Sequence, residues 1–191
     1  MDDLIGTQNP RHRIDSPEEA LTRLEHALPG LLPHRRAQRA TVDWGVVEAE
    51  LGIPLPGDYR LLAESYPSFA FSYGFITVGL PQPGSERRLD GITAGLDIVR
   101  DWWEADMSLG LPPHPAPGGL LPWADSSQGD LFLWVTSGAS PHDWPVAVAT
   151  RDGEWWYYAG GAVQFLAELA DGTVEPWGLT DIHSDVTVLT D

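Results

Sequence analysis

The side chains of this sequence that could take part in catalysis are mainly carboxylic acids. Two carboxyl groups in one cleft can serve as a general acid and a general base. Candidates for such a pair in the second half of the chain are Asp101, Glu104, Asp106, Asp125 and Asp130. The chain has 28 acidic residues, however, so some carboxylates will lie close together by chance. These acids alone therefore do not predict an enzyme.

The sequence lacks the other common patterns of catalytic and metal sites. Its six histidines are scattered and form no HExxH segment, which argues against a metal site. There is no GxSxG motif, and Ser140 beside Pro141-His142-Asp143 is no triad, because adjacent residues cannot orient one another. The absence of lysine excludes a P-loop and a Schiff base. We therefore expect no enzymatic activity, no metal and no cofactor.

Nine tryptophans are the second unusual feature, and they include the adjacent pairs Trp102-Trp103 and Trp155-Trp156. They could pack in the core, anchor a protein interface or stack on sugar rings, and the sequence leaves these three interpretations open. Because neighbouring side chains of a strand face opposite sides, we expect one of Trp155 and Trp156 to be buried and the other exposed.

The charge of the chain is strongly negative and unevenly distributed. Eleven arginines and 28 acids give a net charge of −17, and residues 97–191 contain 15 of the acids but only two arginines. Such a surface repels nucleic acids and anionic membranes and attracts basic partners, although it also keeps a tryptophan-rich protein in solution. Cysteine is absent, which excludes disulfides and thiolate metal sites. With neither a secretory signal nor a membrane-spanning apolar run, the sequence predicts a cytoplasmic protein.

Helical spacing of apolar residues recurs in five segments. The expected helices cover residues 16–28, 41–51, 56–63, 93–106 and 162–169. Ser16 and Glu19 have the spacing of a capping box at the start of the first helix. In the fourth, Leu96, Val99 and Trp103 are expected to share the buried face.

Strands are expected between and after these helices. The period of two from Phe69 to Val78 predicts a strand that changes face through a bulge at Gly74. The later strands are expected at residues 120–123, 131–135, 146–150 and 154–158, with Asp152-Gly153 as the turn of the last hairpin. Consecutive strands with short turns predict a single α+β domain, in which helices cover one side of a mainly antiparallel sheet.

One segment of the chain matches a known signature. It reads Trp44-x-x-Val47-Glu48-x-x-Leu51-Gly52-x-x-Leu55-Pro56-x-Asp58-Tyr59-x-x-Leu62 and resembles the opening signature of the SUKH superfamily, which includes fungal regulators of cell-wall synthesis and bacterial immunity proteins. Later segments also resemble the family in the expected order: residues 121–125 with Gly129-Asp130 and Trp134, the hairpin ending at Trp155, and Val163 with Phe165 and Leu166. Each of these residues has a packing role, so the signature identifies a fold and transfers no catalytic residue.

The resemblance implies a protein-binding module of the SUKH type. Members of this superfamily are commonly the immunity partners of polymorphic toxins, often nucleases, which they neutralise by binding. A cytoplasmic immunity protein that occludes the basic surface of a cognate toxin is therefore the expected function. A SUKH-type regulatory or scaffold protein without a toxin is the alternative, and a carbohydrate-binding module or an enzyme is a more remote one.

The SUKH-like domain is expected to cover residues 41–172, since charge and pattern both change near residue 41. Residues 1–40 would then be an extension with one helix, and residues 173–191 a tail. Within the acidic half we expect acids to steer association and aromatic anchors to slow dissociation. The predicted contact residues are the acids Asp101, Glu104, Asp106, Asp125, Asp130, Asp152 and Glu154, with Trp102 and Trp156 as anchors.

Overall fold

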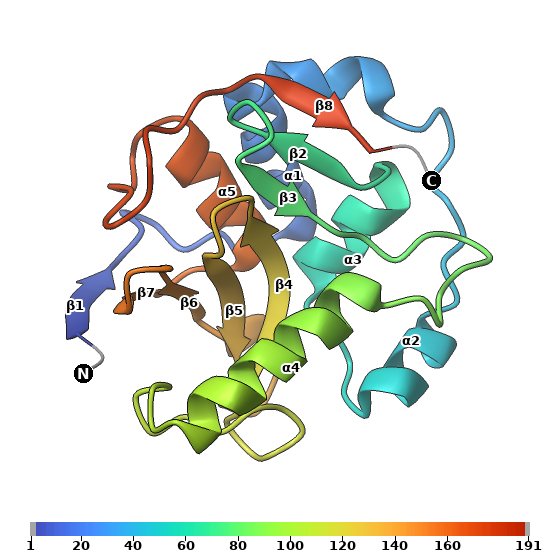
Figure 1. The fold of residues 1–191 in the computed structure, drawn as a ribbon. Coiled ribbons are helices and arrows are strands. Elements are labelled where there is room, and N and C mark those ends of the chain that lie inside the picture. The colour runs from blue at the N-terminus through green and yellow to red at the C-terminus, as the bar shows by residue number, and fades with distance from the viewer. Residues whose placement is uncertain (1–2, 190–191) are drawn as a thin grey trace.

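A single sheet of eight strands forms the centre of the computed structural model, which describes residues 3–189 (Figure 1). The strands are β1 (Asp3–Gln8), β2 (Phe69–Phe71), β3 (Ile76–Val78), β4 (Leu120–Ser126), β5 (Leu131–Val135), β6 (Val146–Ala149), β7 (Glu154–Tyr158) and β8 (Val186–Val188). The helices are α1 (Pro17–Ala27), α2 (Trp44–Leu51), α3 (Gly57–Ser65), α4 (Asp90–Glu104) and α5 (Ala162–Ala170), with short 3₁₀ helices η1 (Pro29–His34) and η2 (Pro141–Asp143). The predicted α+β class is confirmed.

The strand order across the sheet is β1-β7-β6-β5-β4-β3-β2-β8. Strands β2 to β7 pair as antiparallel neighbours, whereas β1 joins β7 in parallel and β8 joins β2 at the opposite edge. The predicted bulge at Gly74 is wrong, because β2 and β3 are two strands joined by a tight turn. Ser72, Tyr73 and Gly74 in that turn all have a positive φ, which reverses the chain within three residues.

Helices lie on both faces of the sheet, not on one face as the sequence predicted. Phe132 and Trp134 of β5 point into the large core that contains α1, α3 and α5, while Leu131, Leu133 and Val135 point into a second cluster with Val99 of α4. In Figure 1, α4 crosses in front of β4 and β5, and α1 and α5 lie behind the sheet. The continuous apolar run of β5 is the sequence pattern that such two-sided burial requires.

Local capping explains where the helices begin and end. The Ser16 Oγ accepts a hydrogen bond from the N–H of Glu19 (3.2 Å), so the predicted start of α1 is confirmed. Helix α2 begins at Trp44, three residues later than predicted, because Asp43 is its N-cap and accepts from the N–H of Val46 (3.2 Å). It ends at Gly52, whose φ of 74° is the left-handed conformation that glycine adopts freely.

Asp58 connects the first turn of α3 to the start of α5. Its half-buried carboxylate accepts one hydrogen bond from the N–H of Tyr59 (2.8 Å) and another from the N–H of Val163 (3.1 Å). Residue 161, the N-cap position of α5, is glycine and offers no side chain, so Asp58 caps this helix from a distant part of the chain. A Cβ atom on Gly161 would lie 2.8 Å from the Asp58 Oδ2.

Residues 3–40 contribute to the same fold and core as the rest of the described chain. Leu21, Leu24 and Leu28 are buried, and α1 packs against α3 and α5. The C-terminal segment also belongs to the fold. Strand β8 pairs with β2, and the ring of Trp177 lies 5.8 Å from that of Trp156. These contacts join residues 3–40 and residues 173–189 to the core of the predicted domain at residues 41–172.

Removing residues 1–40 is therefore expected to abolish cooperative unfolding, because the deletion uncovers apolar side chains of α3 and α5. A milder change, Leu24→Ala, should lower the free energy of unfolding by about 2–5 kcal/mol, as is typical for a truncated core leucine. Denaturant unfolding followed by circular dichroism measures both. Leu32→Ala serves as the control, since Leu32 is an exposed leucine of η1 and should cost far less. A cooperative, fully stable chain starting at residue 41 would contradict this view of the core.

Candidate functional site

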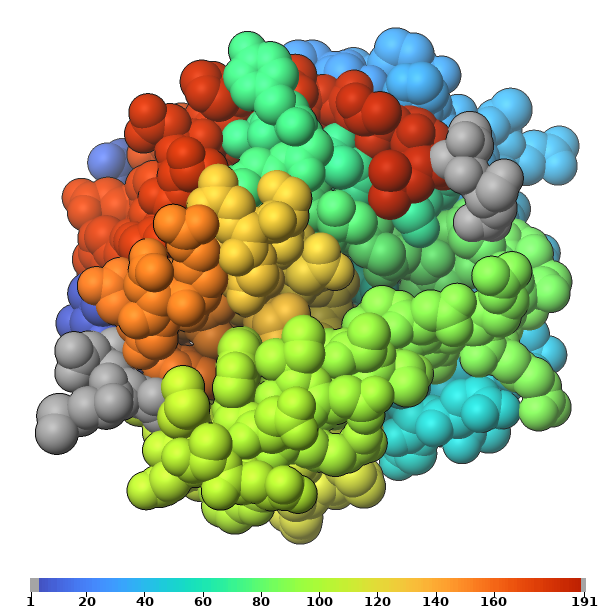
Figure 2. Space-filling view, in the orientation of Figure 1, coloured from blue at the N-terminus to red at the C-terminus, as the bar shows by residue number. Residues whose placement is uncertain are grey.

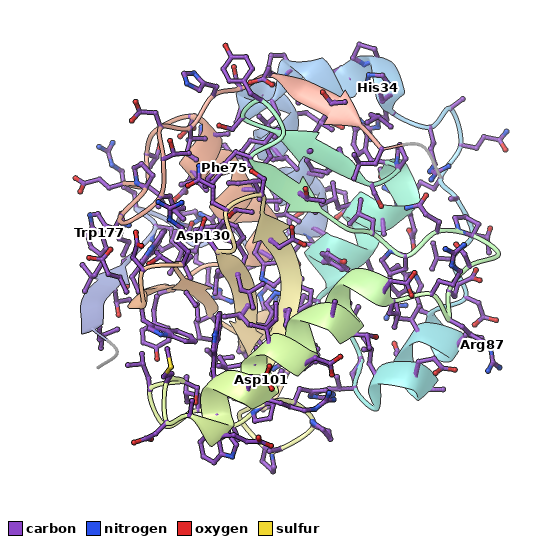
Figure 3. All side chains as sticks on the ribbon, viewed as in Figure 1. His34, Phe75, Arg87, Asp101, Asp130 and Trp177 are labelled. Carbon is purple, nitrogen blue, oxygen red and sulfur yellow. The ribbon has the colours of Figure 1, made fainter. Side chains whose placement is uncertain are left out.

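The structure separates the predicted contact residues into groups around α4 and the sheet (Figure 3). Asp101, Glu104 and Asp106 gather at the C-terminal end of α4, whereas Asp125 and Asp130 come from β4 and the start of β5. In Figure 3, Asp101 lies on α4, and Asp130 lies farther away by the turn between β4 and β5. The predicted residues therefore do not form one continuous surface.

Two predicted anchors need correction because the sheet is covered on both faces. Trp155 and Trp156 are 2% and 0% exposed, so neither of them reaches the surface. The indole N–H of Trp156 donates to the carbonyl oxygen of Trp177 (2.9 Å), which completes its role in the core. Trp102 is half-buried and packs edge-on against Trp155, with ring centroids 5.7 Å apart. Trp156 is therefore excluded as an anchor. Only part of the Trp102 ring is accessible to a partner.

The aromatic side chain that does reach the surface of α4 is Trp103. It is 44% exposed, although the sequence placed it on the buried face with Leu96 and Val99. Trp102, three residues after Val99, takes the inward position instead. Adjacent residues of a helix point about 100° apart, so only one member of the tryptophan pair could face the sheet. Met107 lies just beyond the helix and is 43% exposed. These two apolar side chains were missed by the sequence-based interpretation.

We call the exposed group at this end of the helix the α4 tip; it consists of Asp101, Trp103, Glu104, Asp106 and Met107. Within residues 3–189, none of the three acids forms an ion pair. The last turn of α4 also has no basic residue. A helix C-terminus carries a partial negative charge, so acids at this position are electrostatically unfavourable. The α4 tip therefore holds its charges at a cost to local stability.

The hairpin between β6 and β7 lies beside the α4 tip. A hollow of about 160 Å³ separates them and is lined by Trp102, Met107, Asp152 and Trp155 among others. This arrangement brings Asp152 toward α4, as the prediction of one contact surface requires. Glu154 lies one residue before Trp155 and faces the other side of the sheet, where its Oε2 approaches Gly178. Glu154 is therefore not part of the α4 tip.

A larger cavity of about 400 Å³ lies on the other side of α4, between the helix and strands β3 and β4. Thr77, Asp125 and Leu131 form its floor, because these residues are paired neighbours on three adjacent strands and share one face of the sheet. One wall is the stripe of α4 made by Gly91, Ala94, Gly95 and Ile98, and the facing wall is the loop before α4 with Leu80, Gln82, Ser85 and Arg88. In Figure 2, the surface of α4 crosses the front of the molecule, and the surface around the turn between β4 and β5 lies above it.

The two predicted acids that line the cavity have different environments. Asp130 is buried, and its carboxylate accepts hydrogen bonds from the Ser126 hydroxyl and from the N–H of Arg151 (2.9 Å). It therefore fixes the turn between β4 and β5 against the last hairpin. The sequence predicted Asp130 as a free surface charge, and this prediction is corrected. Asp125 is half-buried, and no donor within residues 3–189 hydrogen-bonds to its carboxylate. Burial raises the pKa of Asp125 above its usual value.

This geometry offers little for acid–base or metal chemistry. Both carboxylate oxygens of Asp130 already have donors, so Asp125 has no free carboxyl partner with which to share the roles of acid and base. Among residues 3–189, no group of three or more His, Asp or Glu side chains could hold a metal ion. Within the same residues, no helix combines the length and the apolar character needed to cross a membrane.

Comparisons with known proteins leave the chain without an assigned relative: no protein-family model matches it, and no curated protein matches it.

Neutralising the tip acids should stabilise the protein. The double change Asp101→Asn with Glu104→Gln removes two charges from the negative end of α4 and should raise Tm by about 1–4 °C at low salt. The matched control is Glu18→Gln with Glu19→Gln, which removes two exposed acids from the first turn of α1 and should lower Tm, because acids are favourable there. Differential scanning calorimetry at low and high salt measures both effects. Equal shifts of the same sign would contradict the role of helix position.

Asp125→Asn should also stabilise the protein, but with a pH dependence. Since burial raises the pKa of Asp125 in the folded state, ionisation is easier in the unfolded chain and reduces stability as pH rises through the folded pKa. At pH 7 the variant should therefore melt on the order of 2 °C higher than the original chain. The difference should vanish at a pH below about 3.9, where the carboxyl group is protonated in both states. Identical melting curves at pH 7 would overturn this account of Asp125.

Proposed function

We propose that this protein is a cytoplasmic immunity protein of the SUKH superfamily, which binds a cognate polymorphic toxin, of the nuclease type, and occludes its basic surface. The α4 tip is the observation that carries the proposal. It combines an exposed tryptophan and an exposed methionine with three acids that have no cationic partner in the described chain. The resemblance of residues 44–62 to the SUKH signature supports the same function.

The residues of the α4 tip are more typical of a protein interface than of a surface that stays exposed to solvent. Tryptophan and methionine are enriched at the centres of protein interfaces, where they fill pockets of the partner. Unpaired acids around such anchors attract a basic surface and find their counter-charges only in the complex. A toxin that cleaves nucleic acids needs a basic cleft for its substrate, so it presents the complementary charge.

In this mechanism the acids and the anchors have separate tasks. The net charge of −17 and the tip acids accelerate the encounter with a basic toxin, over a range limited by a Debye length of about 8 Å at physiological salt. Trp103 and Met107 then become buried and slow dissociation. The bound protein blocks the cleft of the toxin without performing any reaction itself.

Co-expression with the toxin domain encoded by a neighbouring reading frame tests the proposal. The full chain should restore growth of cells that produce the toxin, and the purified proteins should form a stable complex. A toxin that kills equally well in the presence of the chain would disprove the proposed function.

Binding kinetics then test the α4 tip. Asp101→Asn with Glu104→Gln should slow association several-fold at low salt and leave dissociation nearly unchanged, because the tip acids act before contact. Trp103→Ala should instead accelerate dissociation by about 30-fold, the effect of a typical tryptophan anchor. Surface plasmon resonance separates the two rates. Glu18→Gln with Glu19→Gln, which changes the net charge equally on α1, is the matched control. If this control slows association as much as the tip variant does, the tip is not the contact surface.

A further inference from the structure

The cavity between α4 and strands β3 and β4 is separate from the α4 tip. Its shape depends on the small side chains of the helix. Gly91, Ala94, Gly95 and Ile98 recur at the spacing that places residues on one helix face. A Cβ atom on Gly91 would meet nothing within 4 Å, while Gly95 lies directly against Pro122. The volume of about 400 Å³ falls in the range of ligand-binding pockets.

Asp125 is the half-buried carboxylate of this cavity, and it has neither a hydrogen-bond donor nor an ion-pair partner within residues 3–189. It lies on the floor between Thr77 of β3 and Leu131 of β5, its paired neighbours on the same face. The other charged groups that line the cavity have their own partners. Arg88 and Asp90 form an ion pair with each other (3.7 Å) at the entrance, and Asp130 is bound by Ser126 and Arg151. No cation of the described chain therefore neutralises Asp125.

Both walls beside Asp125 include apolar side chains. Ala94 and Ile98 of α4 lie on one side, and Leu80 lies on the other, next to the polar Gln82 and Ser85. Ile98 is 41% exposed, so that part of the wall lies open to solvent. An alkyl chain of three or four carbons could lie along these side chains while a charged group at its end reaches the carboxylate. Arginine and lysine side chains have this combination of an apolar stem and a cationic head.

We propose that the cavity receives a basic side chain of the partner protein, whose cationic head pairs with the Asp125 carboxylate and whose alkyl stem packs along α4. This inference rests on the proposed function, because the side chain belongs to the partner that the protein neutralises. The fork of an arginine guanidinium fits best, since it can donate two parallel hydrogen bonds to one carboxylate. The Asp125 carboxylate then gains in the complex the donors that the free protein does not provide.

Binding of a cation at Asp125 must depend on pH. The cation pairs with the ionised carboxylate, so binding strengthens as pH rises through the pKa of Asp125, which burial raises. The other charged groups that line the cavity are Arg88 and Asp90 at the entrance and Asp130 in the turn before β5. Asp125→Asn removes the titrating group and should therefore remove the pH dependence.

The probe for this site is N-acetyl-arginine-N-methylamide, titrated into the full chain and followed by NMR chemical shifts. It should bind with a dissociation constant on the order of 1 mM, as suits a single side chain, and shift the amides of Thr77, Asp125 and Ala94. The neutral isostere N-acetyl-citrulline-N-methylamide should bind about 10-fold more weakly, because it lacks the charge.

Two variants test the geometry. Asp125→Asn should weaken probe binding about 10-fold or more and abolish its pH dependence. Ala94→Leu should also block the probe, because the larger side chain enters the cavity from an exposed helix position that tolerates leucine. The matched control is Glu19→Gln, which removes an exposed acid from α1 on the other face of the sheet and should leave probe binding unchanged.

The results distinguish this inference from the proposed function. Equal binding of the arginine and citrulline probes, or chemical shifts that lie away from the cavity, would overturn the inference even if the toxin experiment succeeds. Selective binding of the arginine probe at Asp125 without any rescue from a toxin would disprove the immunity function and leave a cation-binding cavity. Agmatine separates a free small molecule from a side chain: if it binds more than 100-fold more tightly than the blocked arginine, the occupant is a metabolite and not a protein.

Discussion

The close contact between Gly95 and Pro122 is the constraint on which the arrangement around α4 depends. A Cβ atom on residue 95 would lie 2.7 Å from the Pro122 Cβ, so the helix can approach β4 this closely only through glycine. From this contact, Val99 continues into the second core cluster and Trp102 reaches Trp155. Trp103 must then point outward, and the cavity opens on the other side of the helix. A single close approach thus determines both the α4 tip and the cavity.

The residues that resemble the SUKH signature act through packing on the opposite side of the sheet. Trp44 lies under the Arg60 guanidinium (4.9 Å) and donates its indole N–H to Glu64 (2.8 Å). Tyr59 packs edge-on against Trp134, with ring centroids 5.0 Å apart, and donates its hydroxyl hydrogen to the carbonyl of Gly79 (2.5 Å). Gly79 is at the edge of the cavity. The signature therefore stabilises the frame that carries the cavity, and one of its residues, Tyr59, also lines it.

Sequence patterns predicted the elements that are defined by neighbouring residues and missed those that depend on distant ones. Strands β5 and β7 were predicted at their exact limits, because their apolar runs and the Asp152-Gly153 turn are local signals. Strands β1 and β8 were missed, since each is stabilised by pairing with a strand more than 100 residues away. Trp102 and not Trp103 points inward because of the position of Trp155 on the sheet. The cavity could not be predicted, because a helix, a loop and three strands that lie apart in the sequence enclose it.

The acids of this protein fall into two physical classes, and the difference bears on function. Glu25 and Glu168 are buried and accept hydrogen bonds from Tyr66 (2.6 Å) and Tyr158 (2.8 Å), so their charges are part of the fold. The tip acids and Asp125 have no such donors, and helix position or burial makes each of them unfavourable for the isolated chain. A fold that only required solubility could place these charges anywhere on its surface. Their location beside an exposed tryptophan and inside a cavity is accounted for if a cationic partner provides the missing donors.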